Sequence, residues 1–216
     1  MASVKFCGLT RPEDADVAAN LGAAYVGVIF AEESQRRITP ARARLVLGLA
    51  RRGVQRVGVF GTASVDAIAA IADDTYLDVV QMHGRFGGDS VRELRTMFRG
   101  EIWAVVGVDR ARGSLGPDVY DLADEADAIL LDTAIGGVSG GRGRSFDWRA
   151  MADEVHVLAT RVPVVVAGGL THETVGEAIG LLSPATVDVS SGVEASPGIK
   201  DHALMRAFAE AVRSAS

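Results

Sequence analysis

The sequence alternates eight times between short apolar runs rich in β-branched residues and longer stretches with helical periodicity. The runs are almost continuously apolar, as in Ile129-Leu130-Leu131, and this is typical of parallel strands that are covered on both faces. Eight strand–helix units predict a closed (β/α)8 barrel, with residues 1–216 forming a single domain. We expect strands at Val4–Cys7, Tyr25–Phe30, Arg56–Phe60, Val79–His83, Ile102–Val108, Ala128–Asp132, Val162–Ala167 and Thr186–Ser190.

Helix starts support the same alternation. Thr10, Thr39 and Ser64 each precede a predicted helix whose first turn contains proline or an acidic residue, so each is a candidate N-cap. The chain has neither a Gly-x-Gly-x-x-Gly segment after its first strand nor a Gly-Lys-Ser/Thr phosphate loop. These absences disfavour an open nucleotide-binding sheet.

Composition narrows the class of protein. Apolar residues make up 48% of the chain and charged residues 23%, so a large core can form. The net charge of -6 disfavours a nucleic-acid binder, but it leaves room for a small anion held by backbone amides. The single cysteine excludes an intrachain disulfide. No signal-peptide pattern or membrane-length apolar run is found, so we expect a cytoplasmic protein without a membrane partner.

Two glycine-containing turns follow the last two predicted strands. Gly168-Gly169 comes after the seventh strand, and Ser190-Ser191-Gly192 ends the eighth. These loops are the usual phosphate site of an eightfold barrel, because glycine lets backbone N–H groups approach an anion closely. The alternative is that the glycines only make tight turns, but their position on this pair of strands favours a phosphorylated small molecule.

Two further glycine features are weaker. The tripeptide Gly8-Leu9-Thr10 reappears as Gly169-Leu170-Thr171, which suggests related strand–helix units. The glycine-rich loop at 136–143 either closes over a ligand as a lid or is only a mobile connection.

Other candidate residues lie at the ends of predicted strands, where barrel enzymes keep their chemistry. Asp132 ends an apolar strand, so we expect burial to raise its pKa and suit it to donate a proton; a structural acid is the alternative. Cys7, taken alone, is more typical of a small buried apolar residue, although Lys5 beside it could stabilise a thiolate. His83 and Asp188 could bind a sugar hydroxyl or organise their loops.

Two arginines and the four histidines are the remaining candidates for binding a ligand or a metal ion. Arg36 and Arg37 are either solvated surface charges or a fork for a carboxylate or phosphate. The four histidines lie in unrelated segments and no paired acidic spacing is found, so no metal site is expected.

Several segments, in order along the whole chain, resemble phosphoribosylanthranilate isomerase. They are Lys5-Phe6-Cys7-Gly8-Leu9-Thr10, Ser34-Gln35-Arg36-Arg37-Ile38, Val57-Gly58-Val59-Phe60, Val80-Gln81-Met82-His83-Gly84, Leu130-Leu131-Asp132, residues 140–148, Ala167-Gly168-Gly169-Leu170, residues 187–194 and Pro197-Gly198-Ile199-Lys200-Asp201.

The resemblance implies an Amadori rearrangement of N-(5-phosphoribosyl)anthranilate. In this family Asp132 would correspond to the acid that protonates the ribose ring oxygen, and Cys7 to the base that removes a proton from the adjacent sugar carbon. Arg36 would hold the anthranilate carboxylate, Asp188 would contact a hydroxyl, and Gly169, Ser191 and Gly192 would form the phosphate turns. No metal or organic cofactor is implied, and the partner would be the phosphorylated substrate alone, without nucleic acid. The sequence does not distinguish a monomer from a homodimer.

Three alternatives remain. Departures such as Phe6, Arg142 and Thr171 leave room for a paralogue with altered substrate preference. An indole-glycerol-phosphate synthase would need a catalytic lysine inside the barrel, and of the two lysines only Lys5 lies on a predicted strand. A third possibility is a barrel that binds a phosphorylated ligand without catalysis, but the presence of both Cys7 and Asp132 argues against it.

Overall fold

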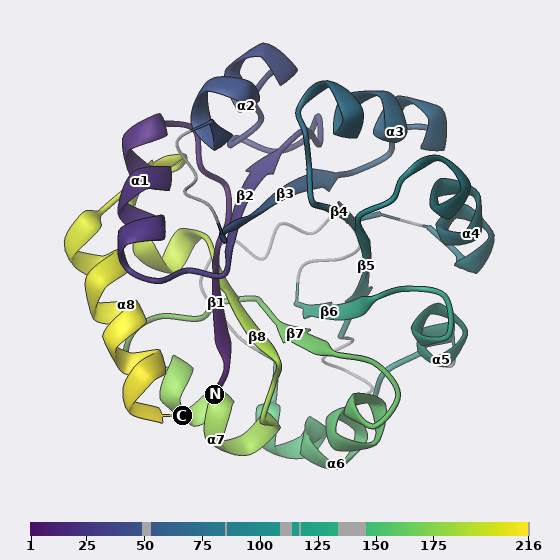
Figure 1. The fold of residues 1–216 in the computed structure, drawn as a ribbon. Helices are drawn as coiled ribbons and strands as arrows, with labels where there is room; N and C mark the ends of the chain where they lie inside the picture. The colour runs from purple at the N-terminus through teal and green to yellow at the C-terminus, as the bar shows by residue number, and fades with distance from the viewer. Residues whose placement is uncertain (49–52, 85, 109–113, 117, 134–145, 216) are drawn as a thin grey trace.

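The structure is a computed structural model, and it describes residues 1–48, 53–84, 86–108, 114–116, 118–133 and 146–215. Eight parallel strands pair in chain order, and β1 also pairs with β8, so the sheet closes into the predicted barrel (Figure 1). The strands are β1 (Ser3–Phe6), β2 (Tyr25–Ile29), β3 (Gln55–Phe60), β4 (Val79–Met82), β5 (Glu101–Gly107), β6 (Ala128–Asp132), β7 (Val164–Val166) and β8 (Thr186–Val189).

Helices surround the barrel (Figure 1), and apolar side chains from helices and strands form one large buried cluster. They are α1 (Pro12–Asn20), α2 (Pro40–Leu47), α3 (Val65–Asp74), α4 (Gly88–Met97), α5 (Asp118–Ala123), α6 (Trp148–Ala159), α7 (Val175–Leu182) and α8 (His202–Ala215). The (β/α)8 prediction is therefore confirmed. Among the described residues, no helix is long and apolar enough to cross a membrane.

The predicted helix caps are confirmed at two of the three positions. The Thr39 side chain accepts a hydrogen bond from the Arg42 amide, and the Ser64 side chain accepts one from Ala67. The prediction for Thr10 was wrong, because Arg11 occupies the N-cap position of α1 and makes no side-chain cap. The Thr10 hydroxyl instead donates to the Gly198 carbonyl at 2.6 Å, a contact that only the folded chain creates.

The predicted strands are correct to within about two residues at either end. The largest difference is in β7, which begins at Val164 rather than Val162. Pro163 has no N–H with which to continue the ladder, although its carbonyl accepts a bond from Ile129. Cys7 and His83 lie just beyond their strands, at the mouth of the barrel.

The inside of the barrel is filled with side chains. Trp103 is the largest of them and is almost completely buried. Its ring packs edge-on against Tyr25 with 4.8 Å between centroids, and its Nε1 donates to Glu101 at 2.9 Å. Valines, leucine and alanines from the other strands complete this inner cluster. The barrel is therefore a packed core rather than a pore, as is usual for this architecture.

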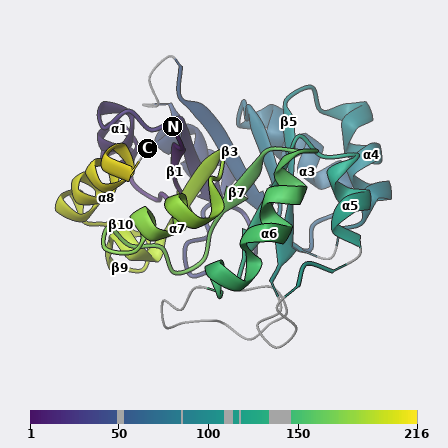
Figure 2. The same cartoon turned by 90° about the horizontal axis from the view of Figure 1, so that it is seen from below.

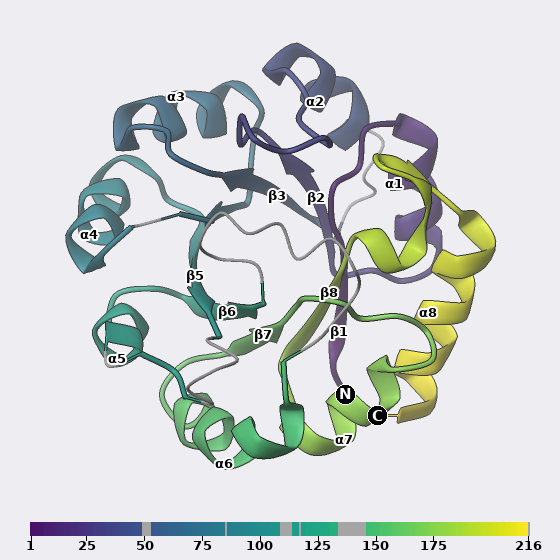
Figure 3. The same ribbon diagram turned by 180° about the vertical axis from the view of Figure 1, so that it is seen from behind.

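A short structure follows β8 at the edge of the barrel beside α8. It consists of the 3-10 turn η1 (Ser191–Val193) and a hairpin of β9 (Glu194–Ser196) with β10 (Ile199–Lys200). Lys200 therefore lies on a strand, contrary to our expectation that only Lys5 would. Figure 2 shows the hairpin at the end of the barrel opposite the chain terminus marked N, and Figure 3 shows the two chain ends close together beside α7 and α8.

Replacing Trp103 by alanine removes the largest side chain of the cluster inside the barrel. We expect Trp103→Ala to lower the free energy of unfolding by about 3–5 kcal/mol, because it leaves a large cavity. Urea denaturation measures this difference, and Trp103→Phe should lose less. A loss below about 1 kcal/mol for Trp103→Ala would contradict a packed interior.

Candidate active site

Lys5 and Cys7 both point into the barrel from the first strand and its end. They are two residues apart, so they share the inner face. Gly27 of β2 provides the space for them: a Cβ at this position would lie 3.1 Å from Cys7 Sγ and 3.3 Å from Lys5 Cε. A larger residue at position 27 would crowd both functional groups.

A buried ion pair joins the first strand to the last. Lys5 is opposite Asp188 in the β1–β8 register, and its Nζ donates to Asp188 Oδ2 at 2.8 Å. Both side chains are buried. The other carboxylate oxygen of Asp188, Oδ1, is buried and has no hydrogen-bond partner among the described residues. This acceptor is therefore available to a donor such as a ligand hydroxyl.

Burial and charge set the ionisation of these groups. Burial raises the pKa of the Cys7 thiol, and the Lys5 ammonium opposes that shift. Burial also raises the pKa of Asp188; Lys5 opposes it, while the charge of Asp132 adds to it. Burial would lower the pKa of Lys5, but the charges of Asp188 and Cys7 outweigh it, so its pKa is raised. Lys5 is therefore held as an ammonium beside the thiol.

Asp132 ends β6 and is half-buried at the barrel mouth. Gly168, which follows β7, faces it: a Cβ there would lie 2.9 Å from Asp132 Oδ1 and 2.6 Å from Thr133 Oγ1. Gly168 has a φ of +87°, in the left-handed region that favours glycine. Both the backbone conformation and the neighbouring carboxyl thus call for glycine at this turn.

The two predicted phosphate turns lie against each other. A Cβ at Gly192 would lie 1.9 Å from the Leu170 carbonyl oxygen, so only glycine fits at this contact. Gly169 has a φ of +70°, and Gly8 in the matching tripeptide has a φ of +71°. Leu9 and Leu170 are both buried, so the sequence similarity between the two segments corresponds to a shared local structure.

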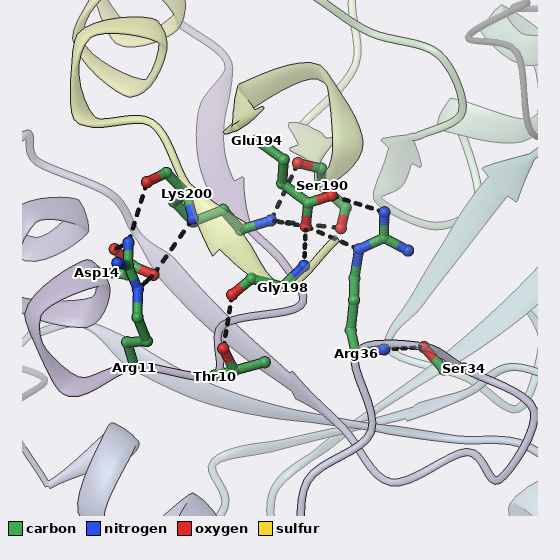
Figure 4. A network of polar contacts seen from close by, with 9 residues as sticks. All are labelled: Thr10, Arg11, Asp14, Ser34, Arg36, Ser190, Glu194, Gly198 and Lys200. Carbon is green, nitrogen blue, oxygen red and sulfur yellow. Dashed lines mark hydrogen bonds and ion pairs between the residues drawn. The ribbon is translucent and has the colours of Figure 1, made fainter. Parts of the chain in front are cut away.

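Arg36 reaches the same mouth from the loop after β2. The aliphatic part of its side chain passes Gly8, where a Cβ would lie 2.6 Å from Arg36 Cδ and 2.9 Å from Ser190 Oγ. Its guanidinium makes a two-bond contact with Glu194, with Nε and Nη2 each 2.7 Å from a carboxylate oxygen. The carboxylate that Arg36 contacts in this structure therefore belongs to the same chain, and the expected contact with a ligand stays a prediction (Figure 4).

The remaining predicted site residues make fewer contacts with the rest of the site. His83 is half-buried after β4, and its amide donates to the Phe60 carbonyl at 2.7 Å. The side chain of Arg37 forms an exposed ion pair with Glu32. The glycine-rich loop at 136–143 lies outside the described residues. In the part of the chain that the structure describes, no group of three or more His, Cys, Asp or Glu is placed to hold a metal ion.

Two residues at the site had no predicted role. Lys200 Nζ donates to Glu194 Oε1 at 2.9 Å and to the Ser190 carbonyl at 3.0 Å, and its side chain is completely buried. Glu194 is also almost completely buried. Both residues lie in segments that resemble the family, but no local pattern indicates that Lys200 would bond to Glu194, or Glu194 to Arg36.

An eightfold barrel that gathers a carboxyl group, a thiol and cations at the carboxyl ends of its strands has the architecture of a barrel enzyme. Comparison with known proteins identifies the family. A family model for N-(5'phosphoribosyl)anthranilate (PRA) isomerase matches residues 4–211. The N-(5'-phosphoribosyl)anthranilate isomerase of Acidithiobacillus ferrooxidans is 42% identical over 213 residues, which is 99% of this chain and 98% of that protein.

Solved structures agree with this result. The phosphoribosyl anthranilate isomerase of Thermotoga maritima matches with a TM-score of 0.86 and 35% identity, covering 99% of this chain and all (100%) of the other. A second isomerase structure, in complex with reduced 1-(o-carboxyphenylamino)-1-deoxyribulose 5-phosphate, matches with a TM-score of 0.83 and 33% identity over 99% of this chain and 100% of the other. This chain belongs to the phosphoribosylanthranilate isomerase family.

The raised pKa of Cys7 can be tested directly, because it is the only cysteine of the chain. A raised pKa means that the reactive thiolate forms at higher pH. We expect the iodoacetamide alkylation rate of the native protein to have its pH midpoint above that of the urea-unfolded chain. Mass spectrometry of samples quenched over time measures both curves. A native midpoint equal to or below the unfolded one would contradict the effect of burial.

Proposed function

We propose that this chain converts N-(5-phosphoribosyl)anthranilate to 1-(2-carboxyphenylamino)-1-deoxyribulose 5-phosphate in tryptophan biosynthesis. The observation that carries the proposal is the order in which an acid, two glycine turns and a thiol follow one another around the closed barrel. Asp132 ends β6, the two glycine turns follow β7 and β8, and Cys7 follows β1, which pairs with β8. A phosphate bound at Gly168, Gly169, Ser191 and Gly192 would therefore be flanked by an acid on one side and a thiol on the other.

In the first step, Asp132 donates its proton to the ribose ring oxygen. The bond between that oxygen and the anomeric carbon breaks, and the nitrogen lone pair forms a Schiff base. This step needs a carboxylic acid close to the leaving oxygen. The position of Asp132 at the end of β6, half-buried beside the Gly168 turn, suits that role.

In the second step, the Cys7 thiolate removes the proton from the adjacent sugar carbon. The electrons of that C–H bond move toward the iminium nitrogen, giving an enolamine that relaxes to the ketone. A thiolate with a raised pKa is a stronger base, while the Lys5 ammonium supports the ionised form. The reaction requires one group that holds a proton and one that takes a proton, and we assign these roles to Asp132 and Cys7. Each step is driven by the transfer of one proton to or from a side chain, so the proposed reaction calls for neither a metal nor an organic cofactor.

The remaining site residues bind the substrate. The free Oδ1 acceptor of Asp188 suits a ribose hydroxyl, and His83 and Ser190 line the same mouth. Arg36 lies at the other end of the substrate and is proposed to hold the anthranilate carboxylate. A phosphate at one end and a carboxylate at the other would fix the sugar between Asp132 and Cys7.

Removing either proton-transfer group should abolish most turnover without abolishing binding. We expect Cys7→Ala and Asp132→Asn each to lower kcat by about 100-fold or more, since general acid and base catalysis contributes about this much. Isothermal calorimetry with the reduced product analogue should give a Kd within a few-fold of wild type. Near-normal turnover in Asp132→Asn would show that the acid was assigned wrongly.

Complementation tests the reaction in a cell. A bacterial strain that lacks this isomerase and requires tryptophan should grow without tryptophan when it expresses this chain. The same strain expressing Cys7→Ala should not grow. A folded, expressed wild-type chain that fails to support growth would contradict the proposed function and favour a different substrate or a non-catalytic role.

A further inference from the structure

Three residues donate hydrogen bonds to the Glu194 carboxylate. Its Oε1 accepts from Arg36 Nε at 2.7 Å, from Lys200 Nζ at 2.9 Å and from the Gly198 amide at 3.2 Å, and its Oε2 accepts from Arg36 Nη2 at 2.7 Å (Figure 4). Burial would raise the pKa of Glu194, but the bonds from Arg36 and the charge of Lys200 outweigh burial, so its pKa is lowered. The carboxylate is therefore ionised, and its two oxygens together accept four hydrogen bonds from Arg36, Lys200 and Gly198.

Lys200 also holds the Glu194 carboxylate in place. Its Nζ donates to Glu194 Oε1, to the Ser190 carbonyl and, at 3.4 Å, to Ser190 Oγ. Three acceptors use all three N–H groups of an ammonium, whereas a neutral amine has only two. Lys200 thus connects Glu194 to Ser190, at the start of the proposed phosphate turn, and the two ends of the site are held by one hydrogen-bonded network.

The network leaves one edge of Arg36 unused. A guanidinium can bind a carboxylate through Nε and one Nη, or through its two Nη groups. Glu194 occupies the first of these edges. No described residue bonds to Nη1, and in Figure 4 this nitrogen points away from Glu194. Among the described residues, the second edge, formed by Nη1 and the outer N–H of Nη2, is free for another carboxylate.

Charge favours an anion at this edge. Arg36 and Lys200 contribute two positive charges and Glu194 one negative charge, so the network carries one positive charge in excess. Arg36 is only 23% exposed, and a partly buried excess charge is stabilised by a counter-charge. A carboxylate on the free edge of Arg36 would supply that charge.

We infer that Glu194 is a positioning residue that fixes which edge of Arg36 meets the substrate, and that it thereby sets the preference for an arylamine carrying a carboxylate. The inference rests on the proposed function. Glu194 does not touch the substrate; it acts by holding the guanidinium, and Lys200 acts by holding Glu194.

If Glu194 acted only through its charge, its removal would have the opposite effect on the binding of a carboxylated ligand. Glu194→Gln removes the only negative charge of the network. If Glu194 served only to tune charge, the more cationic site would bind a carboxylated ligand more tightly. If Glu194 positions Arg36, the freed guanidinium turns toward solvent and the site loses its preference for a carboxylate.

The test compares two ligands that differ only in that group. One is the reduced 1-(2-carboxyphenylamino)-1-deoxyribulose 5-phosphate, and the other is its phenylamino counterpart without the carboxylate. Calorimetry gives Kd for each with wild type and Glu194→Gln. We expect wild type to prefer the carboxylated ligand by about 10-fold or more, as a charge-assisted bidentate contact allows. Glu194→Gln should lose most of this preference, while its Kd for the uncarboxylated ligand stays within a few-fold of wild type.

The matched control is Glu32→Gln. It makes the same substitution in the exposed Glu32–Arg37 pair, which lies in the loop that carries Arg36. This variant should keep the wild-type preference. An unchanged or increased preference in Glu194→Gln would overturn the inference. If that variant does not fold, Glu194→Asp keeps the charge but withdraws the carboxylate by one methylene. It should also lose preference, and a wild-type ratio in Glu194→Asp would likewise overturn the inference.

Turnover of N-(5-phosphoribosyl)anthranilate by wild type, measured in parallel, separates the two claims. A wild type that prefers the carboxylated ligand but shows no turnover would contradict the proposed reaction and leave the role of Glu194 supported. A wild type that turns over the substrate but binds both ligands equally would overturn the role of Glu194 and leave the reaction supported.

Discussion

The barrel closes where its first strand meets its last, and at that seam the Lys5 ammonium lies 2.8 Å from the Asp188 carboxylate. Both groups have left water, which costs several kcal/mol each unless they are paired. Closing the barrel in register therefore brings together two charges that neither strand could bury alone. The same pair places an ammonium beside Cys7 and leaves one buried Asp188 oxygen without a hydrogen-bond partner among the described residues. The chemistry of the site follows from how the fold is closed.

The other charges at the mouth are organised in a similar way. Both lysines of the chain are buried, at Lys5 and Lys200, and each is paired with a carboxylate. A lysine ammonium is a compact charge with three donors that suits a buried network, whereas the flat fork of Arg36 can bind two carboxylates on two edges. The site therefore combines fixed internal charges with one arginine edge that is free for a ligand among the described residues. Such preorganisation lowers the cost of ordering the site when a substrate binds.

Much of the fold could be predicted from the sequence, because strands buried on both faces leave continuous apolar runs. The ends of strands were less certain, since a residue such as Pro163 changes the hydrogen bonding without changing the apolar pattern. The cap at Thr10 was predicted wrongly because its hydroxyl bonds to Gly198, far away in the sequence. Local rules describe Thr39 and Ser64 well, where no distant group competes for the hydroxyl.

The site was predicted less completely than the fold. Strand ends indicated Cys7, Asp132 and Asp188, because parallel strands bring their carboxyl ends to one face. The partnership of Arg36 with Glu194 could not be predicted, since it joins the loop after β2 to strand β9, and these two segments are far apart in the chain.

The claim that the closing ion pair supports the site can be measured with a double-mutant cycle. Lys5→Met, Asp188→Leu and the double variant are compared with wild type by urea denaturation. Each single variant leaves a buried charge without its partner, so we expect each to lose about 3–5 kcal/mol, and the double variant to lose clearly less than their sum. Losses that add to within about 0.5 kcal/mol would show that the two residues act independently, and would contradict this account.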